Sequence, residues 1–183
     1  MAKYRVPIID GGIARIPLTQ GQETIIDVED LPLVENYIWH AWWGGAGFYA
    51  VRNSHKIEGP PRRIYLHRVL LGLDRGDRIE GDHRDRNTLD NRRSNIRLAS
   101  KAENRRNVHR PTRVGRSGYR GVFPCPCSPN WRARICVDYK SVDLGVFEDR
   151  IDAARAYDDG AVKYHGEFAL TNVKLCLLPP LPS

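Results

Sequence analysis

The first sixty residues alternate short apolar, β-branched runs with glycine-containing turns, which predicts a β-rich region at residues 1–60. The strand-like runs fall at residues 14–18, 24–26, 37–39 and 48–51. Between Val28 and Tyr37, apolar residues recur at helical spacing and predict a short helix. Aromatic side chains bury large apolar areas, so we expect the three tryptophans of this region to lie in its core: Trp39, Trp42 and Trp43.

Residues 61–109 carry a second pattern, which predicts a strand, a polar loop, a strand and a helix in succession. The two strands are expected at 79–83 and 96–98. Ser100 followed by Glu103 has the spacing of a capping box, in which two side chains satisfy the first free N–H groups of a helix. A helix is therefore expected to begin there, and Asn104 in its first turn should face back toward the two strands.

Residues 117–172 predict three strands followed by a helix between Asp149 and Gly166. In the middle strand, three apolar residues alternate with two arginines and should lie on the opposite face of the sheet: Trp131, Ala133 and Ile135 against Arg132 and Arg134. The polar, basic segment 110–116 is interpreted as a linker, and 173–183 as a Pro-rich, loosely ordered tail. The whole pattern is typical of an α+β chain.

The composition of the chain indicates a soluble globular protein. With 183 residues, of which 41% are hydrophobic and 28% charged, the chain resembles a soluble globular protein. No run approaches the roughly 18 consecutive apolar residues of a membrane span, and the N-terminus lacks an apolar signal-peptide segment. The four cysteines all lie late in the chain and do not form the pattern of a disulfide framework. We therefore expect a cytoplasmic protein without a membrane partner.

The positive charge is concentrated in the middle of the chain. Residues 61–116 hold sixteen basic and seven acidic side chains, a net +9, whereas residues 1–60 carry −2 and residues 117–183 carry 0. Nearly all of the basic residues are arginine, whose planar guanidinium donates paired hydrogen bonds to phosphate. Such a segment is typical of nucleic-acid binding, and a solvated, salt-bridged surface is the alternative.

The same segment brings together residue types that hydrolyse phosphodiesters. His83 has the intrinsic pKa of a general base near neutral pH. Asp82 and Asn104 could supply a carboxylate and an amide oxygen, a hard ligand pair suited to Mg²⁺ or Mn²⁺. We expect surrounding arginines to hold the backbone of double-stranded DNA: Arg84, Arg86, Arg93, Arg97, Arg105 and Arg106.

The run DHRDRNTLDNRRSNIRL followed by SKAENRRN resembles the HNH endonuclease motif of phage and intron-encoded homing endonucleases. The resemblance implies a ββα-metal fold at residues 61–109 and a bacterial or phage-encoded protein. His83 matches the first motif position, Asn95 the central Asn that ties the loop together, and Asn104 the third position, which carries Asn in place of His. Catalytic roles for His83 and Asn95, and metal binding by Asp82 and Asn104, are implied in this way. His67 would be structural or contact a phosphate.

Residues 117–172 resemble the plant Apetala and ethylene-response-factor (ERF) DNA-binding domain in four successive segments: YRGV, WRARI, LGVF and AARAYDDGAVKYHGEFALTN. The resemblance implies a three-stranded sheet in the major groove. The transferable base contacts are Arg120, Arg132 and Arg134, and Lys140 is at most a phosphate contact. Further arginines and tryptophans of the plant strands are missing here, so the plant target sequence does not carry over.

Three cysteines around the first predicted hairpin of this domain, Cys125, Cys127 and Cys136, suggest a structural zinc site. The Cys-Pro-Cys spacing is uncommon for zinc and no fourth ligand is evident, so buried or idle thiols are the favoured interpretation.

These features predict a site-specific, divalent-metal-dependent DNA endonuclease of the homing type that acts as a monomer or weak dimer. One active site per chain predicts that a monomer nicks one strand. Two alternatives remain open. A DNA-binding regulator with an inactive HNH remnant would bind DNA without cutting it, and a structured-RNA or host-defence nuclease would cut without strong site preference.

Overall fold

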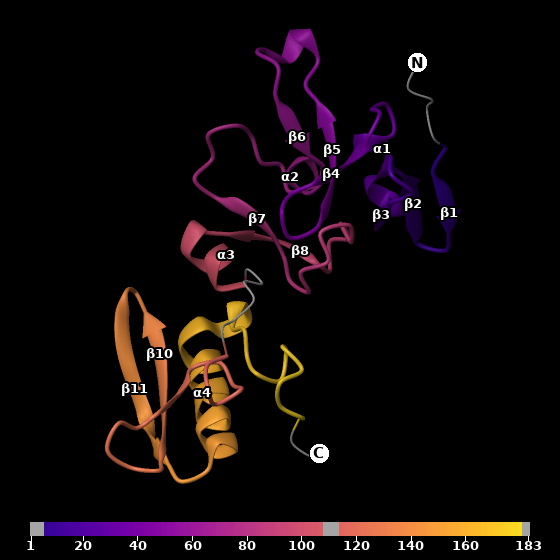
Figure 1. Ribbon diagram of the computed structural model, residues 1–183. Coiled ribbons are helices and arrows are strands. Elements are labelled where there is room, and N and C mark those ends of the chain that lie inside the picture. The colour runs from indigo at the N-terminus through magenta and orange to yellow at the C-terminus, as the bar shows by residue number, and fades with distance from the viewer. Residues whose placement is uncertain (1–5, 108–113, 181–183) are drawn as a thin grey trace. The chain divides into compact units, whose positions relative to one another are not determined.

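Small antiparallel sheets and short helices build this chain, as the computed structural model shows for residues 6–107 and 114–180 (Figure 1). The chain divides into two units, Met1–Asn104 and Arg105–Ser183. This mixed architecture of helices and strands agrees with the expected α+β class. In the described residues, no helix is long and apolar enough to cross a membrane.

The first unit contains eight strands and short helices. Its strands are β1 (Ile8–Asp10), β2 (Ile13–Pro17), β3 (Glu23–Asp27), β4 (His40–Trp43), β5 (Phe48–Asn53), β6 (Arg63–Tyr65), β7 (Glu80–His83) and β8 (Ile96–Ala99). Its helices are η1 (Val28–Asp30), α1 (Leu31–Val34), η2 (Lys56–Glu58) and α2 (Leu66–Leu70), and α3 (Lys101–Asn107) follows β8. The strands form three antiparallel sheets in the orders β1-β2-β3, β4-β5-β6 and β7-β8.

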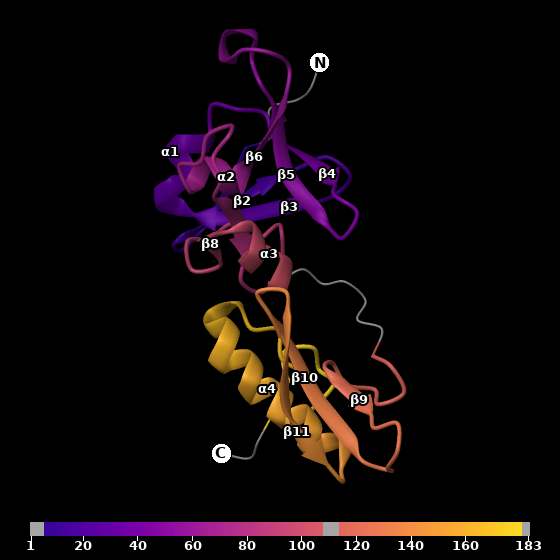
Figure 2. The ribbon, with the colours of Figure 1, turned by 90° about the vertical axis from the view of Figure 1, so that its left-hand side faces the viewer.

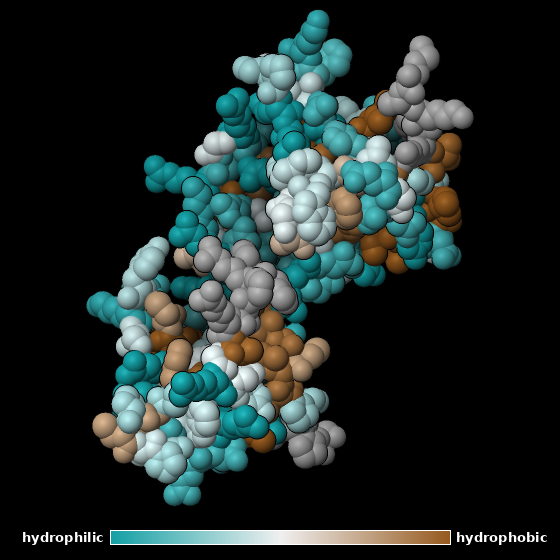
Figure 3. Space-filling model, in the orientation of Figure 1, coloured by the Kyte–Doolittle hydropathy of each residue, from teal (hydrophilic) through white to brown (hydrophobic). Residues whose placement is uncertain are grey.

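One hydrophobic core connects these sheets. Ile16 and Ile26 come from the first sheet, Leu66 and Leu70 from α2, and Ile96 from β8, and all five side chains are buried in one cluster. The core therefore draws on residues of the 1–60 region and of the 61–109 region together. At the outer edge, β1 exposes its two isoleucines, and hydrophobic residues are visible on this side of the unit in Figure 3.

The strand predicted at residues 37–39 is wrong, because β4 begins only at His40. The indole N–H of Trp39 donates to the carbonyl of Val34 at 2.9 Å, which ties this residue to the end of α1 instead of to a sheet. The expected burial of the tryptophans holds for Trp39 alone. Trp42 is half-buried beside Tyr65, and Trp43 is 55% exposed, because it lies at the end of β4 beside the turn.

The second unit contains β9 (Val122–Pro124), β10 (Trp131–Val137), β11 (Lys140–Phe147), α4 (Arg150–His165) and η3 (Gly166–Phe168). The sheet order is β11-β10-β9, and Figure 2 shows α4 lying along one face of the sheet. Ala133 and Ile135 are buried on that side, whereas Arg134 is exposed, which confirms the predicted alternation along β10.

The limits of α4 agree with the prediction from sequence. The Asp149 carboxylate accepts from the N–H of Ile151, and Gly166 ends the helix with a positive φ of 53°. The first strand, by contrast, is shorter than the expected run from residue 117. The Ser117 hydroxyl donates to the carbonyl of Val122 at 2.9 Å, and this bond holds residues 117–121, which precede β9, in a turn.

The C-terminal segment is better ordered than predicted as far as it is described. Leu178 is 3% exposed in the core beneath α4, and the N–H of Leu177 donates to the carbonyl of Asn172 at 2.9 Å. An apolar side chain that fills a core position fixes the backbone beside it, which explains the difference. Residues 181–183 of this tail, and 110–113 of the predicted linker, lie outside the described residues.

Candidate active site

A hairpin and the helix that follows it carry the predicted site residues. Strands β7 and β8 pair antiparallel, with Asp82 opposite Arg97. At the start of α3, the Ser100 hydroxyl accepts from the N–H of Glu103 at 3.3 Å, and the Glu103 carboxylate accepts from the N–H of Ser100 at 2.8 Å. The predicted capping box is confirmed. It fixes the beginning of the helix next to the hairpin, so that the first turn can reach β7.

One face of the hairpin gathers the predicted metal ligands. Side chains alternate along a strand, so Glu80 and Asp82 share a face of β7. From the first turn of α3, Asn104 Nδ2 donates to Glu80 Oε2 at 2.7 Å, so the expected approach of Asn104 to the hairpin is confirmed. Across the hairpin, Arg97 bonds Asp82 Oδ2 through Nε at 2.8 Å and through Nη2 at 2.7 Å, and both side chains are 6% exposed.

The donor set on this face suits a hard divalent cation. Among residues 6–107 and 114–180, no three His, Cys, Asp or Glu side chains converge as a metal site. Glu80, Asp82 and Asn104 nevertheless offer two carboxylates and an amide oxygen, and Mg²⁺ needs few protein ligands because it retains several waters. The guanidinium of Arg97 now neutralises Asp82, and a metal ion on this carboxylate would have to share it with Arg97 or displace it. We conclude that these residues fit Mg²⁺ or Mn²⁺ by the chemistry of their donors.

The imidazole of His83 occupies the other face of β7 and is 4% exposed. Its ring lies 4.9 Å from the ring of His67 and 6.3 Å from that of Tyr49, measured between centroids, in edge-to-face arrangements. The His67 ring also covers Gly81, where a Cβ atom would come within 2.5 Å of His67 Cδ2. The structure therefore does not bring His83 onto the face of Asp82 and Asn104, although His83 is the last residue of the strand.

A chain of hydrogen bonds fixes which nitrogen of His83 carries the proton. A carbonyl only accepts, so the Thr24 hydroxyl donates to the carbonyl of Leu89, at 2.7 Å. The hydroxyl oxygen in turn accepts from Asn91 Nδ2 at 2.7 Å, which orients the amide. Asn91 Oδ1 then faces His83 Nε2 at 3.0 Å. Nε2 must therefore be the protonated nitrogen, and Nδ1 is the basic nitrogen of the neutral ring.

Burial keeps this imidazole neutral. The pKa of His83 is lowered mainly by burial, against the opposing effects of the Asn91 hydrogen bond and of nearby carboxylates, Asp82 first among them. Burial also lowers the pKa of His67 to about 3, and the charge of His83 adds to this effect. Both rings are therefore uncharged at neutral pH. A neutral His83 is in the protonation state that a general base requires.

The loop between β7 and β8 is held together by Asn95. Its Nδ2 donates to the carbonyl of Asp90 at 2.8 Å, and its Oδ1 accepts from the N–H of Asp85 at 3.0 Å. Strand β3 supports the same loop from the 1–60 region, since the N–H of Asn91 donates to the carbonyl of Ile25 at 2.8 Å. Asn95 thus organises the backbone around the site, and its side chain is buried in doing so.

The arginines predicted to hold DNA lie in different surroundings. Arg84 and Arg105 are exposed, and Arg86 and Arg106 are partly buried. Arg93 pairs with Asp30 through two bonds of 2.8 Å but keeps 49% of its side chain exposed. Arg97, also predicted to hold DNA, is buried, because the carboxylate of Asp82 holds its guanidinium inside the unit.

The predicted contacts of the second unit lie on and beside its sheet. Arg120 donates to the Tyr157 hydroxyl at 2.8 Å, which ties it to α4. Arg132 approaches Asp143 on the neighbouring strand at 3.5 Å, while Arg134 and Lys140 are exposed. The four cysteines are free, with Cys125 partly buried and the others exposed: Cys127, Cys136 and Cys176. Of the interpretation as buried or idle thiols, burial does not hold for Cys127 and Cys136, because their side chains lie at the surface.

Sequence reasoning missed three contributors to the site. Glu80 could have been found, because it lies two residues before Asp82 and alternation along a strand puts both on one face. Asn91 was interpreted only as a turn residue, and Thr24 was not considered. No local signal marks Thr24, because it reaches Asn91 across 67 residues of sequence.

Comparisons with known proteins agree with this geometry. A family model described as HNH endonuclease matches residues 64–106. An uncharacterised HNH endonuclease of Acanthamoeba polyphaga mimivirus is 25% identical over 171 residues, which cover 90% of this chain and 83% of the viral protein. No solved structure matches the chain.

Shorter matches lead to plant proteins. An AP2/ERF and B3 domain-containing protein of Oryza sativa subsp. japonica is 46% identical over 56 residues, 31% of this chain and 15% of the rice protein. The APETALA2-like protein 2 of Oryza sativa subsp. indica is 40% identical over 60 residues, 32% of this chain and 14% of its own length. The chain thus spans about a seventh of the length of these relatives. Together, the match over residues 64–106 and the hairpin with its capped helix identify an HNH endonuclease domain in this chain.

Proposed function

We propose that this protein is a metal-dependent DNA endonuclease in which His83 is the general base. The observation that carries the proposal is the hydrogen-bond chain from Thr24 through Asn91, because it makes Nδ1 the basic nitrogen of His83, which burial keeps neutral. A base of this kind can take the proton from the water that attacks the scissile phosphorus. The HNH family match supports phosphodiester hydrolysis as the reaction.

Glu80, Asp82 and Asn104 would hold Mg²⁺ or Mn²⁺ on the adjoining face of the hairpin. When bound, the ion would supply positive charge to the scissile phosphate and its leaving oxygen. Asn95 would keep the loop in the shape that presents His83. Because His83 is 4% exposed, the proposal requires side chains around Nδ1 to move when DNA binds, as side chains at binding surfaces commonly do.

DNA would be held by both units. In the first, the proposed backbone contacts are the arginines around the loop, Arg84, Arg86 and Arg93, and the arginines that follow on α3, Arg105 and Arg106, would add to them. In the second, the exposed face of β10 would enter the major groove with Arg132 and Arg134, and Arg120 and Lys140 would lie at its margin. The short AP2/ERF-type matches support this assignment. One candidate site per chain favours nicking by a monomer, in a site-specific reaction of the homing type.

The test is cleavage of supercoiled plasmid that carries a randomised insert. We expect the full-length protein to convert the plasmid to open circles with Mg²⁺ and to leave it intact with EDTA. A linear product from a protein shown to be monomeric would contradict nicking. Absence of any product with Mg²⁺ or Mn²⁺, together with retained DNA binding, would contradict the endonuclease proposal.

That last result would favour a DNA-binding regulator with an inactive HNH remnant. One observation specifically supports this second candidate, since Asp82 is already engaged by the buried guanidinium of Arg97. In a remnant, the ion pair would replace the metal. Both candidates predict DNA binding, so cleavage is the measurement that separates them.

The substitution Asn91→Asp should move the pH profile of cleavage. A carboxylate beside His83 Nε2 favours the charged imidazolium, so the pKa of His83 should rise. The base is active only when neutral, and the acidic limb of the kcat/KM profile should therefore shift to higher pH by about one unit or more. Asn87→Asp, on the exposed part of the same loop, adds an equal charge without contacting the ring and should leave the limb in place. An unshifted limb in Asn91→Asp would contradict the assignment of His83 as the base.

A further inference from the structure

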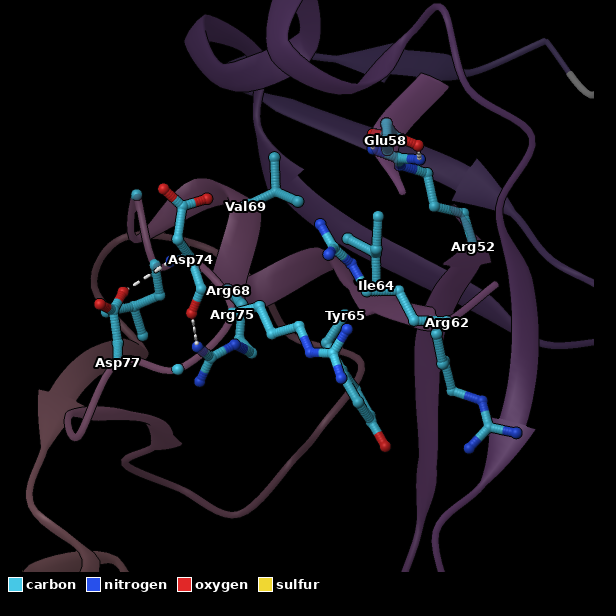
Figure 4. A pocket seen from close by; sticks show the side chains of 14 residues that line it. Arg52, Glu58, Arg62, Ile64, Tyr65, Arg68, Val69, Asp74, Arg75 and Asp77 are labelled. Carbon is cyan, nitrogen blue, oxygen red and sulfur yellow. Dashed lines mark hydrogen bonds and ion pairs between the residues drawn. The ribbon is translucent and has the colours of Figure 1, made fainter. Parts of the chain in front are cut away.

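A cavity of about 800 Å³ lies on the first unit, between β6, α2 and the loop at residues 72–77 (Figure 4). Five arginines line it: Arg52, Arg62, Arg63, Arg68 and Arg75. Three acidic residues accompany them: Glu58, Asp74 and Asp77. The lining thus carries a formal charge of +2, and none of these side chains takes part in the proposed chemistry at His83.

Two of the arginines build the walls. Arg52 forms a double ion pair with Glu58, with bonds of 2.8 and 2.5 Å, and this hydrogen bonding is the main reason why the pKa of Glu58 falls to about 2. Arg68 donates to the carbonyl of Asp74 at 2.5 Å, and the Asp77 carboxylate accepts from the N–H of Asp74 at 2.6 Å. Figure 4 shows these two sets of contacts in different parts of the cavity.

The other three arginines are not bonded to a carboxylate in the described part of the chain, although the charge of Arg62 also lowers the pKa of nearby Glu58. Within the described ranges 6–107 and 114–180, no carboxylate forms an ion pair with Arg62, Arg63 or Arg75. Arg63 stacks over the ring of Trp42, with its Cζ 3.9 Å from the centroid, which orients the guanidinium without cancelling its charge. Like charges around one cavity repel each other, so an anion bound there would be stabilised by all three.

Helix α2 relates this cavity to His83. His67 faces the His83 ring, whereas Val69, two residues further along the helix and therefore about 200° around it, lines the cavity. The cavity and His83 thus lie on opposite sides of one helix, which is about 10 Å wide. Because a DNA strand carries one phosphate per roughly 3.4 Å along its axis, a phosphate in this cavity would lie within a few nucleotides of a phosphate at His83.

We propose that this arginine pocket binds a backbone phosphate of DNA within a few nucleotides of the scissile bond. The choice of DNA as the anion rests on the proposed endonuclease function, since DNA is the polyanion that such a site must hold. Arg62 and Arg75 donate to the phosphate oxygens, and Arg63, held by Trp42, contributes its charge. The pocket reads no base, so its contribution is the same for every sequence.

DNA binding by the full-length chain, measured in EDTA by fluorescence anisotropy at several salt concentrations, tests the pocket without any dependence on cleavage. Arg62→Ala combined with Arg75→Ala should weaken binding about tenfold and reduce the slope of log K against log salt by about 1 to 2. The matched control is Arg15→Ala with Lys163→Ala, which removes two exposed charges elsewhere. It should change affinity less than about twofold. Arg62→Lys with Arg75→Lys keeps the charge and should restore most of the salt slope.

The position of the bound phosphate is tested with DNA substrates in which one phosphate is replaced by an uncharged methylphosphonate. In the wild-type protein, loss of binding is expected at a substitution within a few nucleotides of the mapped cut, and the double alanine variant should not respond at that same position. Equal loss of affinity in the pocket and control variants, at equal thermal stability, would overturn the inference while leaving endonuclease activity intact. Absence of cleavage by the wild-type protein would instead contradict the proposed function, which the binding data do not assume.

Discussion

His83→Ala should abolish Mg²⁺-dependent nicking while leaving DNA binding within about threefold of wild type. A positioned general base contributes roughly 10² to 10⁴ in rate, so the residual activity should fall by at least a hundredfold. The side chain is 4% exposed and offers little surface to bound DNA, which is why affinity should survive. Open-circle formation and filter binding in EDTA, measured on the same preparation, give both values.

Removing a buried imidazole also leaves Asn91 Oδ1 without its donor, at a cost of about 1 to 3 kcal/mol in the free energy of unfolding. His83→Gln is the companion variant, because its amide can still donate to Asn91 but cannot act as a base. Both variants should be inactive. His40→Ala, on β4 and half-buried, is the matched control and should remain active. A His83→Gln protein that nicks DNA at the wild-type rate would contradict the proposed mechanism.

Arg97→Ala should destabilise the first unit by about 3 to 5 kcal/mol. The substitution leaves the buried carboxylate of Asp82 without a countercharge, and an uncompensated buried charge is costly. Urea unfolding followed by tryptophan fluorescence reports on this unit, because three of the four tryptophans belong to it. The control is Arg15→Ala, whose ion pair with Glu23 has the similar length of 2.8 Å but is exposed and should contribute less than 1 kcal/mol.

The same variant connects stability to metal binding. If Asp82 is a metal ligand, Mg²⁺ should recover part of the lost stability, since an ion at one hundred times its dissociation constant stabilises a folded protein by about 2.7 kcal/mol. The free energy of unfolding measured in Ca²⁺-free buffer with EDTA is the reference value. A loss below 1 kcal/mol in Arg97→Ala would contradict the importance of the buried pair, and a loss that Mg²⁺ does not change would contradict metal binding by Asp82.

Helix α4 and strand β4 show which parts of the secondary structure could be predicted from local sequence and which could not. Asp149 determines one end of α4 through its bond to the N–H of Ile151, and Gly166 the other through its positive φ and its bond to the carbonyl of Val162, so local sequence was enough to predict the limits of the helix. The strand expected at 37–39 failed for a different reason. Its apolar residues have strand-forming character, but Trp39 bonds to the end of α1, and this tertiary contact outweighs the local preference.

In the candidate site too, some features could be predicted from local sequence and others could not. The capping box of Ser100 and Glu103 could be predicted because it depends on a spacing of three residues, and this cap places Asn104 in the first turn of the helix. The bond of Asn104 to Glu80, 24 residues away, and the burial of Arg97 on Asp82 depend on the folded hairpin. Only the tertiary structure decided that Thr24, from a sheet outside the HNH motif, orients Asn91 and thereby His83. Those contacts join segments that spacing along the chain does not relate, and they form only when the shared core brings β3 against the loop.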